Sequence, residues 1–111
     1  MTINQRLESE RVGILENYKI TLNQINNMKH AIGFDKRKIK GTKYRKFESY
    51  RNFFTTQEGC KDFEELEELS NQGLMLSRQM GDKWCFHVSK EGMRFLENIT
   101  AVAIIELDDS L

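Results

Sequence analysis

The sequence of 111 residues lacks proline, has only two cysteines and carries no net charge. Seventeen basic and seventeen acidic residues cancel, so no overall field marks the chain for nucleic acid or for an anionic membrane surface. Cys60 and Cys85 have no paired spacing, and no signal peptide or long apolar run accompanies them. We therefore expect a reduced, cytoplasmic protein that does not associate with a membrane. We attach no function to the lack of proline.

The motifs of common enzyme families are also missing. The sequence has no nucleophile elbow, no phosphate-cradling glycine loop and no HExxH helix. Cys85 and His87 would share one face of a strand, and His30 lies on a predicted helix, but a zinc site takes three or four ligands. We predict a packed cysteine beside a satisfied or surface histidine, in a protein that is not an enzyme and holds no metal or cofactor.

Two helical segments are predicted before residue 34. Residues 1–20 carry apolar side chains at a spacing that allows a helix, although Gly13 lies within it. We interpret them as an N-terminal helical arm or extension, which either packs into the core or mediates dimerisation. Thr21 and Gln24 then form a capping-box pattern that opens a second helix, which ends at Gly33. Its apolar residues at helical spacing are Leu22, Ile25, Met28 and Ile32.

A third helix is predicted to begin at Asp62, whose carboxylate can accept a hydrogen bond from an unpaired amide of the first turn. Three apolar residues recur at a three-residue step and form one stripe, while glutamates occupy the other faces. Gly73 lies where the chain must leave the helix, because a residue without Cβ adopts the left-handed conformation at little cost. The stripe consists of Phe63, Leu66 and Leu69.

Two short strands and a last helix follow. Polarity alternates along residues 74–78 and 84–88, as expected for half-buried strands, and a turn is predicted at residues 81–83. Ser89 can cap a helix whose buried face would contain Met93, Phe95, Leu96 and Ile99. The tail of residues 100–111 has β-branched residues that suit a short strand, for which a second protomer could supply the pairing. We therefore keep a homodimer as one expectation.

This order of elements resembles the C-terminal half of a winged-helix domain. The residues that carry the resemblance are Leu69, Gly73, Leu74, Trp84, Phe86, Val88, Ser89 and Gly92. The resemblance implies an α+β fold, with a winged-helix-like single domain that is mainly helical and has a small antiparallel β-hairpin. This domain would span residues 21–99, between the N-terminal arm of residues 1–20 and the C-terminal strand or tail of residues 100–111.

A second resemblance rests on three phrases of the sequence, INNMKHAIGF at residues 25–34, YRNFF at residues 50–54 and WCFHVSKEG at residues 84–92. Together they resemble a group of small uncharacterised proteins of phages and prophages of Gram-positive bacteria, over residues 21–99. This resemblance implies a mobile-element origin and a place in the cytoplasm of a bacterial host cell. It carries no activity with it.

The most informative local feature is a basic segment that ends at Arg51. Eight cations face two carboxylates between Asp35 and Arg51, a local balance of +6. Tyr44, Phe47 and Tyr50 are interleaved among them, and cations beside aromatic faces suit a phosphate backbone with stackable bases. The alternative is a solvated loop whose aromatics point into the core. The candidate nucleic-acid-binding residues are Lys36, Arg37, Lys38, Lys40, Lys43, Tyr44, Arg45, Lys46 and Arg51, with Arg78 and Lys83 of the wing.

The next segment is acidic, with one lysine against six carboxylates between Gln57 and Glu68, a balance of −5. The two segments could neutralise one another in the fold. In a DNA-binding winged helix the helix before the wing usually enters the major groove, where glutamates would face phosphates. Binding through an ordinary recognition helix is therefore not expected. The candidate protein-binding residues are Glu64, Glu65, Glu67 and Glu68, unless they serve only for solubility.

Two functions from different classes follow from these patterns. The first is a non-enzymatic phage or prophage accessory protein that is nucleic-acid-binding or regulatory and acts through the basic aromatic segment and the wing. The alternative is an anti-CRISPR-like inhibitor of a host defence nuclease, in which the acidic helix occupies the basic groove of a host nucleic-acid-binding protein. The expected partner is therefore a nucleic acid or such a host protein.

Overall fold

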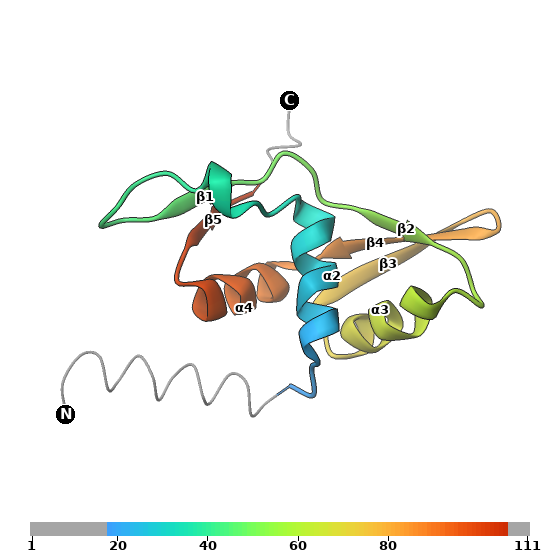
Figure 1. The fold of residues 1–111 in the computed structure, drawn as a ribbon. Coiled ribbons are helices and arrows are strands. Elements are labelled where there is room, and N and C mark those ends of the chain that lie inside the picture. Colours follow the sequence, from blue (N-terminus) through green and yellow to red (C-terminus); the bar gives the residue numbers. More distant parts are fainter. Residues whose placement is uncertain (1–17, 107–111) are drawn as a thin grey trace.

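Figure 1 shows the fold in a computed structural model, which describes residues 18–106. Most of the predicted arm, residues 1–17, and the end of the tail, residues 107–111, lie outside the described residues. The fold class is α+β, as predicted. The elements are α2 (Leu22–Ile32), the 3-10 helix η1 (Lys36–Lys38), β1 (Lys46–Glu48), β2 (Phe54–Thr56), α3 (Lys61–Asn71), β3 (Met75–Met80), β4 (Lys83–Val88), α4 (Lys90–Thr100) and β5 (Ala103–Ile105).

The predicted hairpin of β3 and β4 is confirmed and is part of a larger sheet. A third antiparallel strand, β2, pairs with β4, so the strand order is β2–β4–β3. A second, two-stranded sheet joins β1 to β5 in parallel, with Phe47 opposite Ile104. The sequence patterns predicted neither β1 nor β2, because three residues are too few for a recognisable alternation.

Helices α2 and α3 lie on one face of the three-stranded sheet, and α4 lies beside α2 and β5 (Figure 1). Between them, all five strands and helices α2, α3 and α4 contribute to one hydrophobic core. The opposite face of the sheet carries no helix among residues 18–106. The largest fully buried side chains of the core are Phe47, Phe86, Phe95, Met28, Ile32, Leu66, Leu69, Leu74, Met75 and Leu96.

Two predicted helix starts are confirmed by their side-chain hydrogen bonds. At the start of α2, the Thr21 hydroxyl accepts from the Gln24 amide at 3.1 Å, and the Gln24 side chain accepts from the Thr21 amide at 2.9 Å. At the start of α4, the Ser89 hydroxyl accepts from the Gly92 amide at 3.0 Å. Both contacts satisfy donors that the first helical turn leaves unpaired. Leu22 does not join the buried stripe of α2, because its side chain is exposed.

The predicted N-cap of α3 is wrong by two residues, and the predicted end of the helix is confirmed. Cys60, not Asp62, occupies the N-cap position, and it makes no capping hydrogen bond with its side chain. Asp62 lies in the first turn instead, where the helix dipole favours a carboxylate. At the other end, Gly73 adopts a left-handed φ of 82°, and the Leu74 amide donates to the Leu69 carbonyl at 3.0 Å.

The C-terminal strand predicted in the tail is confirmed as β5, and its partner is β1 of the same chain. Val102 and Ile104 are buried in the common core, so this segment is packed with the rest of the fold. The pairing of β5 therefore does not depend on a second protomer. None of the helices among residues 18–106 has the length and apolarity needed to cross a membrane.

Candidate nucleic-acid interface

The basic lobe, defined as residues 36–51, starts at a tight turn after α2. The carboxylate of Asp35 accepts from the Arg37 amide at 2.9 Å and pairs with the Arg37 guanidinium at 3.0 Å. The hydrogen bonds from the Arg37 side chain and backbone hold the pKa of Asp35 below its ordinary value, and the same contact raises the pKa of Arg37. Asp35 therefore caps η1, which carries the cations of residues 36–38.

A loop of residues 40–46 projects from the body of the protein between η1 and β1 (Figure 1). Its base is closed by two backbone hydrogen bonds of 2.8 and 2.9 Å between Lys40 and Lys46. Tyr44 is 81% exposed, with the Lys43 ammonium 5.7 Å from its ring centre. Phe47, by contrast, is fully buried against Phe34. Of the interleaved aromatics, Tyr44 and Tyr50 point outward and Phe47 belongs to the core.

Tyr50 lies beside two of the cations, Lys38 and Arg51. Its ring lies against Gly33, where a Cβ atom would come within 2.5 Å of the ring. The Lys38 ammonium lies 4.7 Å and the Arg51 guanidinium 5.5 Å from the ring centre, both within the range of a cation–π contact. Tyr50 remains 53% exposed. A fixed, half-exposed aromatic ring between two cations can stack on a base while the cations contact its phosphates.

The segment after the basic lobe ties it to α2 and to the sheet. Arg51 donates from its guanidinium to the His30 carbonyl at 2.7 Å, near the C-terminus of α2. The Asn52 side chain accepts from the Val88 amide at 2.7 Å and donates to the Val88 carbonyl at 3.0 Å. The Phe53 amide donates to the Ala31 carbonyl at 3.0 Å. These contacts set the position of Tyr50 and Phe53 relative to the sheet.

Replacement of Asn52 by alanine is expected to destabilise the protein by about 2 kcal/mol, because it leaves the backbone polar groups of buried Val88 without partners. Urea unfolding of the two proteins measures the difference. Asn52→Asp is the matched variant, because it keeps an acceptor for the Val88 amide but places a second carboxylate oxygen, which cannot donate, opposite the Val88 carbonyl oxygen. We expect Asn52→Asp also to be less stable than the native protein, because the two oxygens repel each other. Equal stability of all three proteins would contradict the anchoring role of this side chain.

Two grooves meet at Tyr50 and Arg51. The helix groove, of about 510 Å³, lies at the end of α2 and is lined by His30, Gly33, Phe34, Asp35, Lys36, Arg37, Tyr50 and Arg51. The sheet groove, of about 520 Å³, is lined by Tyr50, Arg51, Asn52, Phe53, Leu76, His87, Val88, Ser89, Lys90 and Glu106. A third hollow of about 320 Å³ lies beside Lys29, Lys36 and Arg45. Cations line all three, so the basic lobe is surrounded by hollows that suit an anionic chain.

Seven of the eight predicted cations of the basic lobe are exposed, and Arg51 is half-buried. Within residues 18–106, the one ion pair joins Arg37 to Asp35. The structure therefore brings these cations together on one projecting part of the molecule. It does not bring Arg78 and Lys83 to them, because the β3–β4 hairpin extends to the opposite side (Figure 1).

The four predicted glutamates of α3 divide into two pairs. Glu65 accepts two hydrogen bonds from the Asn23 side chain, at 2.8 and 2.9 Å, and Glu68 accepts from the Gln24 side chain at 3.1 Å. These two therefore contribute to the contact between α2 and α3. Glu64, Glu67 and Glu68 are exposed, and Glu65 is half-buried. Glu64 and Glu67 take no part in these hydrogen bonds, so they are the pair that a partner can contact without disturbing α2.

The expectation that the basic and acidic segments neutralise one another is wrong. No ion pair joins them, although residues 36–68 are all among the described residues. Helix α3 and the basic lobe lie on opposite sides of α2 (Figure 1). The molecule thus has a basic and an acidic surface that are separated in space, and each can act on a partner by itself.

Cys85 and His87 share the sheet face away from α2 and α3, as their spacing predicts. The Cys85 sulfur lies 3.7 Å from His87 Nε2, and His87 Nδ1 lies 2.6 Å from the Asn52 carbonyl oxygen. Cys85 is 6% exposed, so the prediction of a packed cysteine beside a satisfied histidine is confirmed. Among the described residues, no three His, Cys, Asp or Glu side chains are grouped as metal ligands would be.

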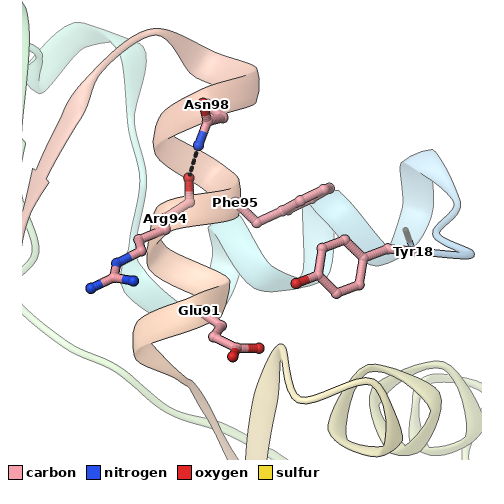
Figure 2. Close-up of a pocket in the computed structure, with 5 residues that line it drawn as sticks. All are labelled: Tyr18, Glu91, Arg94, Phe95 and Asn98. Carbon is pink, nitrogen blue, oxygen red and sulfur yellow. Dashed lines mark hydrogen bonds between the residues drawn. The ribbon is translucent and has the colours of Figure 1, made fainter. Parts of the chain in front are cut away.

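Figure 2 shows a smaller hollow, of about 280 Å³, between α4 and Tyr18. The Tyr18 and Phe95 rings meet edge to face with centres 5.6 Å apart, and the Asn98 side chain donates to the Arg94 carbonyl. The Arg94 guanidinium points away from the two rings (Figure 2). The Glu91 carboxylate lies on the same side of α4 as the rings (Figure 2). The hollow is therefore lined by a packed aromatic pair and one carboxylate, and we assign it no function.

Comparison of this chain with family models, with curated proteins and with solved structures finds no match. Its function therefore has to be argued from its own surface. Sequence reasoning found the cations by their density but missed Phe53 and Lys90, which enter the interface only through the fold. The register of β2 against β4 places Phe53 on the outer sheet face, and no sequence signal marks that placement.

Proposed function

We propose that this chain is a non-enzymatic phage or prophage protein that binds nucleic acid through the basic lobe. The observation that carries the proposal is the gathering of Lys36, Arg37, Lys38 and their neighbours around Tyr50, on a surface separate from the acidic helix. Lysine and arginine neutralise phosphates and release their counterions, which drives binding without regard to sequence. Exposed tyrosines add stacking on bases, so an aromatic-rich basic surface favours nucleic acid over other anions.

We also propose that the fold is winged-helix-like. The order α3–β3–β4–α4 and the antiparallel sheet support it. One helix, α3, lies between β2 and the hairpin, whereas a helix-turn-helix uses two. Since α3 exposes Glu64 and Glu67, we assign recognition to the basic lobe and treat Arg78 and Lys83 as a separate contact of the hairpin.

Fluorescence anisotropy tests the proposal. A labelled mixed-sequence duplex and its single strand are titrated with the protein at about 50 and about 200 mM salt. Binding dominated by phosphates should weaken by orders of magnitude over this range, because the entropy gained for each released counterion falls as the salt concentration rises. The proposed function would be excluded if the affinity did not change with salt concentration. It would also be excluded if neither probe bound at the lower salt concentration.

The exposed Glu64 and Glu67 support a second candidate, the inhibition of a host CRISPR nuclease through α3. If it is right, Glu64→Lys with Glu67→Lys abolishes inhibition of DNA cleavage by the purified nuclease and leaves the melting temperature unchanged, since both side chains are exposed. The pair Glu65→Lys with Glu68→Lys is the comparison, because it should lower the melting temperature by breaking contacts with α2. A native protein that does not inhibit cleavage would exclude this candidate.

A homodimer stays a prediction, which sedimentation velocity can test.

A further inference from the structure

Three side chains form a row across the sheet face that no described helix covers. The register pairs Leu76 with His87, and it pairs Phe54 with Phe86, so Phe53 precedes β2 on the same face as His87. Phe53, His87 and Leu76 all line the sheet groove. Phe53 is 51% exposed, and the His87 ring is held by the 2.6 Å contact of its Nδ1 with the Asn52 carbonyl. The row is a fixed, partly apolar platform.

Two cations lie beside this platform. Arg51 and Lys90 line the sheet groove, together with Glu106, its one carboxylate among the described residues. Tyr50 and Arg51 form the boundary with the helix groove, in which Lys36 and Arg37 lie. A chain of phosphates that starts at the cations of η1 can therefore continue past Arg51 toward Lys90, with its bases turned toward Tyr50 and Phe53.

The shape of the basic lobe favours unpaired bases. Its cations are carried by a three-residue 3-10 helix, a loop and a three-residue strand, and none of these is long enough to enter a major groove as a recognition helix does. A duplex also hides the faces of its bases, whereas a single strand exposes them to aromatic side chains. The exposed rings of Tyr50 and Phe53 would have no partner in a duplex.

We infer that the preferred ligand of the basic lobe is a single-stranded nucleic acid, with its phosphates along η1, Arg51 and Lys90 and its bases stacked on Tyr50 and Phe53. This inference rests on the proposed function and narrows it to one class of nucleic acid. Substitution of Phe53 tests the inference separately from the proposed function, because Phe53 carries no charge and contributes only to stacking.

The test compares Phe53→Ala and Phe53→Tyr with the native protein, on a labelled strand of about 16 nucleotides and on its duplex. Phe53→Ala should bind the strand about tenfold more weakly, which is the effect of one lost stacking contact. Phe53→Tyr keeps an aromatic face and should bind the strand within about twofold of the native protein. Duplex affinity should be the same for all three proteins, because the Phe53 side chain is uncharged. Since this side chain is only 51% exposed, Phe53→Ala should lower the melting temperature slightly, and binding is measured well below the melting temperature of all three proteins.

Two results would overturn the inference and leave the proposed function in place. One is salt-sensitive binding that is as tight for the duplex as for the strand. The other is strand binding that does not respond to Phe53→Ala while it is lost in the variant with Lys36, Arg37 and Lys38 reversed in charge. If neither probe binds at about 50 mM salt, the proposed function and this inference both fail.

Discussion

Reversal of the charge of Lys36, Arg37 and Lys38 to glutamate is expected to weaken nucleic-acid binding at about 50 mM salt by about 100-fold. Each of the three side chains is exposed at η1, beside Tyr50 and the helix groove. Their loss removes about three phosphate contacts, so the slope of log affinity against log salt should also fall by about 2 for a single strand. Anisotropy titrations at several salt concentrations measure both quantities.

A matched variant separates the contribution of the basic lobe to nucleic-acid affinity from the contribution of net charge. Lys19→Glu, Lys61→Glu and Arg94→Glu change the total charge by the same amount at exposed positions outside the lobe. We expect this variant to lose less than about fivefold in affinity, because exposed charges more than a Debye length away are screened. Equal losses of affinity in the two triple variants would show that nucleic acid is attracted by the net charge of the whole molecule and not by the basic lobe. Because Arg37→Glu also breaks the pair with Asp35, the melting temperatures of both variants are compared first.

Gly92→Ala is expected to destabilise the fold by about 3 kcal/mol and to lower the melting temperature by about 15 °C. Gly92 lies in the first turn of α4, where an added Cβ would overlap the Leu74 carbonyl oxygen and come within 2.7 Å of the Val88 side chain. The Leu74 carbonyl cannot move away freely, because it accepts from the Ser89 amide at 3.1 Å. Helix α4 must therefore shift from the sheet to admit a single methyl group.

Arg94→Ala is the control for this substitution, because Arg94 is exposed on the same helix and alanine favours helix formation. Its stability should stay within about 0.5 kcal/mol of the native protein. Thermal and urea unfolding measure both variants. If Gly92→Ala and Arg94→Ala unfold at the same temperature, the close approach of α4 to Leu74 is not a constraint on the fold.

The sequence predicted the elements whose signals are local. The capping box at Thr21, the cap at Ser89 and the stop at Gly73 all act within one helical turn, so they can be read without the fold. The N-cap at Asp62 was wrong because a carboxylate is also favoured inside the first turn, by the dipole alone. Strand β1 could not be predicted, since its partner Ile104 lies 57 residues from Phe47.

The candidate interface was predictable in its charge and not in its shape. Eight cations in one segment are visible in the sequence. Packing alone decides that Tyr44 and Tyr50 point outward and that Phe47 points inward. Phe53 reaches the interface because Asn52 bonds to Val88 and fixes the register beside β4. No sequence signal indicated that the β3–β4 hairpin, which carries Arg78 and Lys83, would extend away from the other cations.

The measurement that tests the central claim most directly is an NMR titration of the labelled protein with an unlabelled single strand at about 50 mM salt. Amide signals from residues 36–53 and from Lys90 should shift in proportion to bound strand, because these residues form the basic lobe and the sheet groove. Signals from α3 (Lys61–Asn71) should stay in place, because that helix lies on the opposite side. Shifts confined to α3 or to the β3–β4 hairpin would contradict the account.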